Sequence, residues 1–191
     1  MSAFEFAFTL FGLVLGLALT AVLAGFVGVL KARTSTPGVT LPVRIGWLTP
    51  VLAAVVVSDL ITFWLAAWGV RESVVVTEPA LLFGAAVTSI YFVTASLIFP
   101  DNPEKWPDLD LWFDLHKGQI GFGIVAANIG FSIADVVGRQ LTWTSIPLVQ
   151  YTYLLLMLSL TITRRRWQSL TVLLLLLAIV VWSVLGLPAI F

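Results

Sequence analysis

Long apolar stretches separated by short polar segments make up most of the chain. A helix needs about 20 apolar residues to cross the roughly 30 Å of hydrocarbon in a bilayer. A transmembrane β-barrel needs apolar and polar residues in alternation instead, and a run such as Leu173–Leu177 does not alternate. We therefore predict an all-α fold, with one transmembrane domain (1–191) built from a bundle of six helices. The predicted spans are about Phe4–Leu30, Ile45–Val70, Pro79–Phe99, Leu115–Val137, Trp143–Thr163 and Trp167–Leu187.

The composition supports a membrane protein. Hydrophobic residues make up 60% and charged residues 10% of the chain, whereas soluble domains carry about 25% charged residues. The mean hydropathy of +1.05 excludes a soluble enzyme and a disordered protein. The formal net charge is zero, so we expect the lipid bilayer as a partner and no nucleic acid. The absence of cysteine excludes disulfides and thiolate chemistry.

The basic residues favour one orientation. Short cytoplasmic loops carry an excess of Lys and Arg. With the N-terminus outside, the inner segments hold Lys31, Arg33, Arg44, Lys105, Lys117, Arg164, Arg165 and Arg166. The outer segments then hold Arg71 and Arg139. We predict a multi-pass protein of the bacterial inner membrane with both termini in the periplasm. Since no Lys or Arg precedes the first span, we expect this span to be retained rather than cleaved as a signal peptide.

Two spans carry small residues at four-residue spacing, a pattern that lets helix backbones approach closely in lipid. On the first span these are Gly12, Gly16, Thr20, Ala24 and Gly28, and on the fourth they are Ala126, Gly130 and Ala134. They form either contacts between spans of this chain or a face for a partner or a second copy. We expect spans one and four at the centre of the bundle and the Leu-rich span six at its rim.

Asp59 lies near the middle of the second predicted span. A carboxylate at that depth must be partnered, protonated or in contact with a wet cavity. Asn128, Tyr91 and Thr88 lie at matching depths, so we predict an intramembrane polar cluster of Asp59, Asn128, Tyr91 and Thr88. The cluster is either a proton or cation relay or a buried hydrogen bond that sets helix register.

More polar residues lie near the outer face, among them Gln150, Tyr151 and Tyr153. Asp135 and Arg139 are four residues apart and can form an ion pair along a helix. These residues form an interfacial layer or, alternatively, an outward-opening vestibule.

The inner loop 100–114 is acidic and contains tryptophan. Its apolar residues can lie in the headgroup layer as a short interfacial helix, and Asp110 or Asp114 can cap the next helix. We predict partner contact through Trp106, Asp108, Asp110 and Trp112. A divalent cation at Asp108, Asp110, Asp114 and His116 is the alternative, but this spacing matches no known metal motif, and we predict no metal site.

Two segments carry a resemblance. Residues 99–110 read Phe-Pro-Asp-Asn-Pro-Glu-Lys-Trp-Pro-Asp-Leu-Asp, and residues 44–50 read Arg-Ile-Gly-Trp-Leu-Thr-Pro. With them the chain resembles small multispanning bacterial inner-membrane proteins that have no assigned activity. The resemblance implies a compartment and no mechanism.

Catalytic motifs are missing from the sequence. It has one His, no G-x-S-x-G or H-E-x-x-H motif, no P-loop and no dinucleotide fingerprint. We therefore predict no catalytic residues and no cofactor. The function we expect is a non-enzymatic accessory or interaction subunit of a membrane complex. A small oligomeric transporter or channel that uses Asp59 is the alternative, and a lipid-modifying enzyme comes third.

Overall fold

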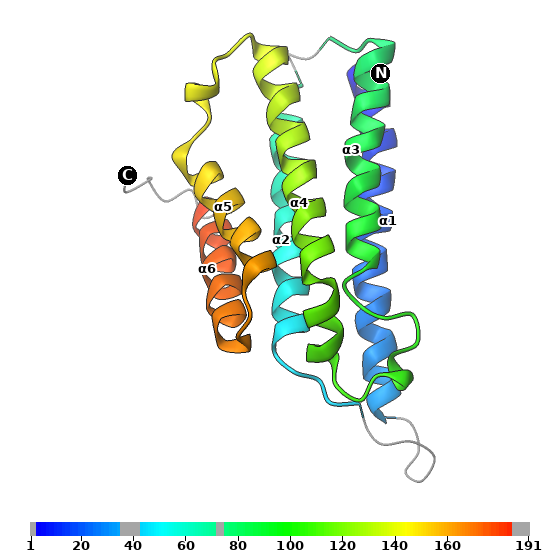
Figure 1. Cartoon of the computed structure of the whole chain (residues 1–191). Coiled ribbons are helices and arrows are strands. Elements are labelled where there is room, and N and C mark those ends of the chain that lie inside the picture. Colours follow the sequence, from blue (N-terminus) through cyan, green and yellow to red (C-terminus); the bar gives the residue numbers. More distant parts are fainter. Residues whose placement is uncertain (1–2, 35–42, 72–74, 185–191) are drawn as a thin grey trace.

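The computed structural model describes residues 3–34, 43–71 and 75–184, and this part of the chain forms six α-helices (Figure 1). The predicted all-α fold is confirmed. The helices and two short 3₁₀ turns are α1 (Ala3–Thr34), α2 (Leu48–Gly69), α3 (Glu78–Ser96), η1 (Pro103–Lys105), α4 (Leu109–Arg139), η2 (Trp143–Ser145), α5 (Leu148–Ile162) and α6 (Arg166–Val184).

Five of the described helices, α1, α2, α3, α4 and α6, are long and apolar enough to cross a membrane. The end of the sixth predicted span, at 185–187, lies outside the described residues. Helix α4 begins six residues before its predicted span, because the segment expected to be an interfacial helix is its first part. The chain is therefore compatible with a multi-pass membrane protein.

Helix α5 is shorter than the predicted span Trp143–Thr163. It has 15 residues, or about 22 Å at 1.5 Å per residue. The residue before a proline disfavours the helical conformation, and Ile146, which precedes Pro147, is extended. The extended residue separates the turn η2 from α5, so the helix begins only at Leu148.

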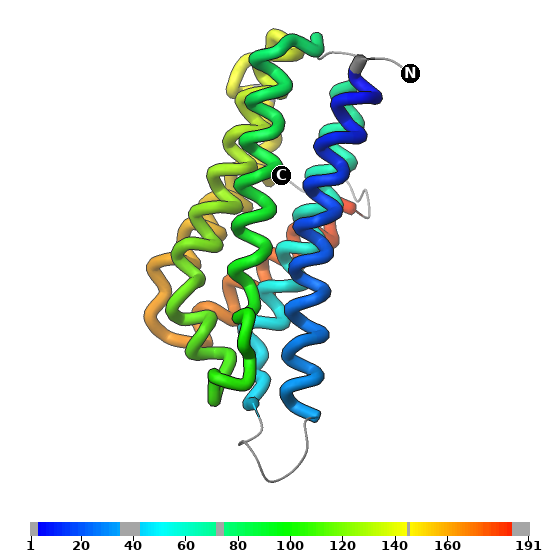
Figure 2. The backbone as a smooth tube through the Cα atoms, turned by 90° about the vertical axis from the view of Figure 1, so that its right-hand side faces the viewer, coloured from blue at the N-terminus to red at the C-terminus, as the bar shows by residue number. Residues whose placement is uncertain are grey.

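The helices run alternately up and down, with α2 and α4 in contact at the centre (Figures 1 and 2). Helices α1 and α3 pack together on one side, and α5 and α6 pack together on the other. The prediction of a central first span is wrong: 22% of the apolar window of α1 is buried, against 39% for α2 and 44% for α4. Since α2 also carries Asp59, this carboxylate lies in the core. Helix α6 contacts α2 and α5 and exposes leucines on its outer side, as expected for a helix at the rim.

The small residues of α1 do not form one buried face. Gly12 packs against the ring of Trp64, and Gly28 lies beside Pro103. Gly16, Thr20 and Ala24 are exposed on the bundle surface. The face of α1 that is buried in the bundle instead carries Leu15, Ala18, Val22 and Val29.

The small residues of α4 do pack on a neighbouring helix of the same chain. A Cβ atom on Gly130 would lie 2.7 Å from Cγ2 of Val87, and one on Gly123 would lie 3.2 Å from Cβ of Thr94. Both contacts are with α3. Ala126 and Ala134 are half-buried on α4.

Candidate functional site

Three buried polar side chains meet at mid-depth of the bundle. Asp59 of α2 is 4% exposed, Tyr91 of α3 is 0% and Asn128 of α4 is 7%. The Tyr91 hydroxyl donates to Oδ2 of Asp59. Asn128 Nδ2 lies 3.3 Å from the same Oδ2 and 3.1 Å from Oη of Tyr91. The structure thus brings together three of the four residues expected in the intramembrane cluster.

The fourth residue, Thr88, is buried but stands apart from these hydrogen bonds. Its hydroxyl donates to the backbone carbonyls of Gly84 and Ala85 on its own helix, at 2.9 and 3.1 Å. This is the usual way for a threonine to satisfy its hydroxyl within a helix.

Two residues of α5 extend the cluster. Gln150 donates from Nε2 to Oδ1 of Asn128 at 3.2 Å. Tyr153 is 4% exposed and lies close enough to Asp59 for its hydroxyl and the carboxylate to interact, but Oη has no hydrogen bond of good geometry in the described part of the chain. Tyr91 and Asn128 are the described side chains that donate well-formed hydrogen bonds to Asp59, and both bonds go to Oδ2. An unsatisfied buried hydroxyl therefore lies beside a carboxylate that has an oxygen to spare.

A polar cleft of about 270 Å³ leads to this cluster from one end of the bundle. It begins at Asp59 and runs toward the end at which α2, α4 and α6 finish, past Ser132 and Asp135 of α4 and Ser183 of α6. The cleft exists because α5 and α6 lie alongside the lower part of α2 and α4, while α4 rises above them (Figure 1). The polar residues that line it are Asp59, Thr62, Asn128, Ser132, Asp135, Gln150, Tyr153 and Ser183.

Arg139 and Asp135 lie in the last turns of α4. Their Nε and Oδ1 atoms are 2.6 Å apart, so the predicted ion pair is confirmed. The pair balances the charge of Asp135. Asp59 lies deeper, near the middle of α2, at the level of Asn128 on α4. The lining of the cleft thus includes one acid that has a basic partner and one deeper acid, Asp59, that has none among the described residues.

On the other side of Asp59 the bundle is closed. Apolar side chains from α2, α4, α5 and α6 fill this half, and each is at most 1% exposed: Leu52, Val56, Ile120, Ile124, Met157, Leu160, Leu173 and Leu176. Such a dry layer opposes the passage of water or ions. Within the described residues, the lining of the cleft runs from Asp59 toward the end at which α2, α4 and α6 finish and does not extend into this layer.

A larger cavity of about 670 Å³ lies between α1, α2, α3 and α4. Rings of Phe8, Phe11, Trp64 and Phe83 line much of it, and its lining is mostly apolar. Because this lining offers few polar groups, the polar cleft is the better candidate for a site.

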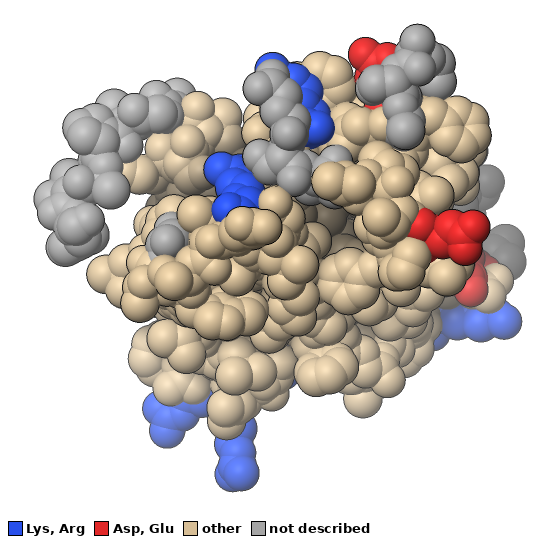
Figure 3. Space-filling model, turned by 90° about the horizontal axis from the view of Figure 1, so that it is seen from above, with Lys and Arg blue, Asp and Glu red and all other residues tan. Residues whose placement is uncertain are grey.

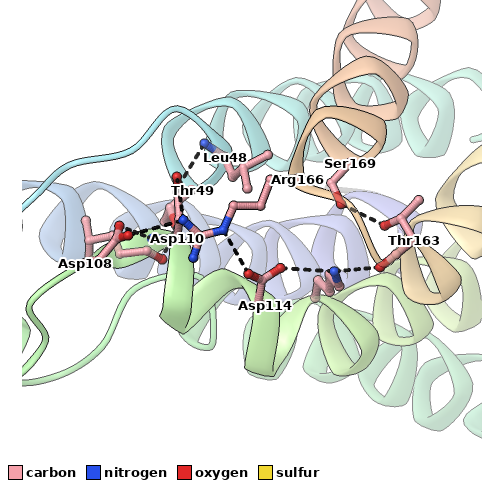
Figure 4. A network of polar contacts seen from close by, with 10 residues as sticks. Leu48, Thr49, Asp108, Asp110, Asp114, Thr163, Arg166 and Ser169 are labelled. Atoms are coloured by element: carbon pink, nitrogen blue, oxygen red, sulfur yellow. Dashed lines mark hydrogen bonds and ion pairs between the residues drawn. The ribbon is translucent and has the colours of Figure 1, made fainter.

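The acids at the opposite end of the bundle surround an arginine (Figure 4). The Arg166 guanidinium of α6 lies 3.3 Å from Oδ2 of Asp108, 3.2 Å from Oδ2 of Asp114 and 3.9 Å from Oδ2 of Asp110. Lys117 reaches Oδ1 of Asp114 at 3.1 Å. Within the described residues, no group of three or more acids, His or Cys is placed to hold a metal ion. The network ties α4 to α6.

Asp108, not Asp110 or Asp114, caps α4: its Oδ1 accepts from the backbone N–H of Asp110 at 2.9 Å. Asp110 instead accepts from the backbone N–H of Leu48, at 3.3 Å, and so holds the start of α2. The sequence could not place this contact, because the two residues are 62 positions apart.

The two tryptophans of the inner loop contact the chain itself. The Trp112 indole donates to the carbonyl of Leu97 at 3.0 Å, Trp106 packs edge-on against Trp112, and His116 stacks on Trp112. Trp106, Asp108, Asp110 and Trp112 are all half-buried. Their contact with a partner stays a prediction.

Comparison of the chain with protein-family models, curated proteins and solved structures found no significant match. The site is therefore interpreted from its geometry.

The sequence analysis did not single out Ser132 and assigned Tyr153 to the outer polar layer rather than to the intramembrane cluster, although one signal pointed to the cleft. On α4 the polar residues Asn128, Ser132 and Asp135 are spaced by four and three positions, which puts them on one helix face. On α2, Asp59 and Thr62 are three apart. Two polar stripes on neighbouring central helices predict a polar surface between them.

Proposed function

We propose that the chain is a small bacterial inner-membrane transporter that crosses the bilayer six times, and that the cleft is its outward-facing access path to Asp59. In this arrangement both termini lie in the periplasm, and the Trp143–Ser145 turn completes the fifth crossing in the headgroup layer. The distribution of Lys and Arg supports this orientation, since eight of the ten lie at the end where α2, α4 and α6 begin. Seen from the opposite end, the described part of the surface is mostly uncharged and carries a few charged side chains (Figure 3).

One observation carries the proposal: a polar cleft reaches from the proposed outer end to a carboxylate at mid-depth and stops there. Acids within spans face water-filled cavities and mark solute or proton paths, and many transporters bind their substrate near the bilayer midplane. A dry layer on the inner side is what alternating access requires of an outward-facing state.

Thiol labelling tests the path directly, because the chain has no cysteine of its own. Ser132→Cys places a thiol in the cleft, and Ser159→Cys makes the same substitution in the inner half of α5. With a membrane-impermeant maleimide added outside, we expect labelling of Ser132→Cys at least tenfold faster than of Ser159→Cys. Equal rates, or no labelling of Ser132→Cys, would show that the cleft is closed to outside water.

Transport also requires access from the inside. Met157→Cys places a thiol in the dry layer, one turn inward from Tyr153. In inside-out vesicles we expect slow labelling of Met157→Cys, as the inward-facing state is visited. If this thiol is never labelled while Ser132→Cys is labelled from outside, the cleft is a blind binding site and the protein is not a transporter.

One observation favours the accessory or interaction subunit as a second candidate. Gly16, Thr20 and Ala24 form a small-residue stripe on the exposed surface of α1, where a helix of a partner or of a second copy could approach closely. A photo-crosslinker at position 20 tests it in intact membranes. Crosslinks to a defined protein support this role, and crosslinks to lipid alone contradict it.

A further inference from the structure

The inner end of the cleft presents hydrogen-bond acceptors together with aromatic rings. This inference rests on the proposed function and names the class of solute that the cleft binds. Tyr153 Oη is buried close to Asp59 but makes no hydrogen bond of good geometry with the described residues. The well-formed hydrogen bonds that Asp59 accepts from described side chains both use Oδ2. Phe63 and Phe131 line the same space, and their rings lie 5.1 Å apart between centroids.

The charge of the cleft favours a cationic occupant. Two acids line it, Asp59 and Asp135. Asp135 is paired with Arg139 at 2.6 Å, whereas Asp59 has tyrosine and asparagine neighbours and no Lys or Arg partner among the described residues. A carboxylate at this depth requires a compensating charge or a proton, and a bound cation supplies that charge.

The kind of ligand atoms separates an organic cation from a metal ion. Calcium takes six to eight oxygen ligands and magnesium an octahedral set, but the cluster offers one spare carboxylate oxygen and one hydroxyl. The ammonium group of a primary amine donates three hydrogen bonds, and its alkyl part can pack against aromatic rings. A cavity of about 270 Å³ is larger than the roughly 150 Å³ cavity that holds a benzene ring, so it has room for a small alkylammonium ion.

We propose that the cleft binds a small primary ammonium ion. Its nitrogen donates to Oδ1 of Asp59 and to Oη of Tyr153, and its alkyl part lies against Phe63 and Phe131.

Protection of Ser132→Cys from the maleimide tests this with propylammonium as the probe, at constant pH and ionic strength. For one site the labelling rate falls by the factor 1 + [L]/Kd, so we expect an about elevenfold decrease at ten times the half-protecting concentration. Propanol, which has nearly the same shape without the charge, and sodium ion are expected to change the rate less than twofold.

Variants locate the binding. Asp59→Asn is expected to abolish protection, and Tyr153→Phe to raise the half-protecting concentration severalfold. Tyr151→Phe is the matched control, because the Tyr151 hydroxyl is exposed and bonded to the carbonyl of Trp143 at 2.7 Å, so protection is expected to be unchanged. An unchanged labelling rate without the probe shows that each variant is folded.

The outcomes separate this inference from the proposed function. If Ser132→Cys is labelled but propylammonium gives no protection, or if sodium or propanol protects equally well, the ammonium site is refuted and the access path stands. Protection that survives both Asp59→Asn and Tyr153→Phe also refutes it. If Ser132→Cys is not labelled at all, the access path itself is refuted.

Discussion

Two glycines of α1, Gly16 and Gly25, should respond in opposite ways when each is replaced by alanine and the stability is measured. A Cβ atom on Gly25 would lie 2.6 Å from Cβ of Phe99 and 3.0 Å from its Cγ. Because Cβ of Phe99 is bonded to the backbone, a rotamer change cannot relieve the overlap, and α1 must move away from the segment that follows α3. Gly16 lies nine residues earlier on the same helix, and a Cβ there would have no neighbour within 4 Å.

The magnitudes follow from two opposing terms. Alanine is favoured over glycine within a helix by about 1 kcal/mol, and overpacking a close contact costs about 1–3 kcal/mol. We therefore expect Gly16→Ala to leave the free energy of unfolding unchanged or raise it by up to about 1 kcal/mol. Gly25→Ala should be less stable than Gly16→Ala by about 1–3 kcal/mol, which is the overpacking cost alone.

Reversible unfolding in mixed micelles with an increasing fraction of SDS, followed by far-UV circular dichroism, measures both variants under one condition. A difference below about 0.5 kcal/mol, the size of an ordinary surface substitution, would refute the packing of α1 against Phe99. The same result would question the position of α1 at the edge of the bundle.

Three further predictions test the buried cluster, the basic end and the orientation. Asp59→Leu removes the acceptor of Tyr91 and should lower the free energy of unfolding by about 1–3 kcal/mol. Asp59→Asn should lower it by less than about 1 kcal/mol. Equal losses in SDS unfolding would contradict the hydrogen-bonded cluster. Arg166→Gln should lower the free energy of unfolding by about 1 kcal/mol, since the side chain is 42% exposed and its ion pairs are screened by solvent. The loss should be smaller in high salt. Arg164→Gln is the control and should leave the free energy of unfolding unchanged. Maleimide added to the periplasmic side should label Thr144→Cys and not Glu104→Cys, and the reverse pattern would invert the orientation and place the cleft mouth in the cytoplasm.

Helix content could be predicted from the sequence because a membrane span imposes its own length and apolar composition. The order of the helices in the bundle could not, since small residues mark close contacts without naming the partner. The four-residue spacing from Gly12 to Gly28 is the same whether the stripe faces α3, a lipid or another protein. The structure buries the stripe that contains Leu15 and Ala18 instead.

The intramembrane cluster was within reach of sequence reasoning for a physical reason. A carboxylate at mid-depth must find donors, and few polar side chains lie at that depth, so Asn128 and Tyr91 were the natural partners of Asp59. Gln150 and Tyr153 were assigned to the outer face. In the structure α5 begins at Leu148, and Gln150 and Tyr153 lie deep enough to reach Asn128 and Asp59.

The short fifth helix is therefore what connects the fold to the proposed site. A helix continued back to Trp143 would add five residues, about 7.5 Å, and would lie over the part of α4 that carries Ser132 and Asp135. The extended residue before Pro147 prevents this, and the polar stripe of α4 faces a cleft instead of a neighbouring helix. If the polar cluster served only to set the helix register, it would need no cleft leading to it. It would also not explain why the Tyr153 hydroxyl is buried without a hydrogen bond of good geometry among the described residues. The shape of the bundle and the state of that hydroxyl both favour a cleft that receives a ligand.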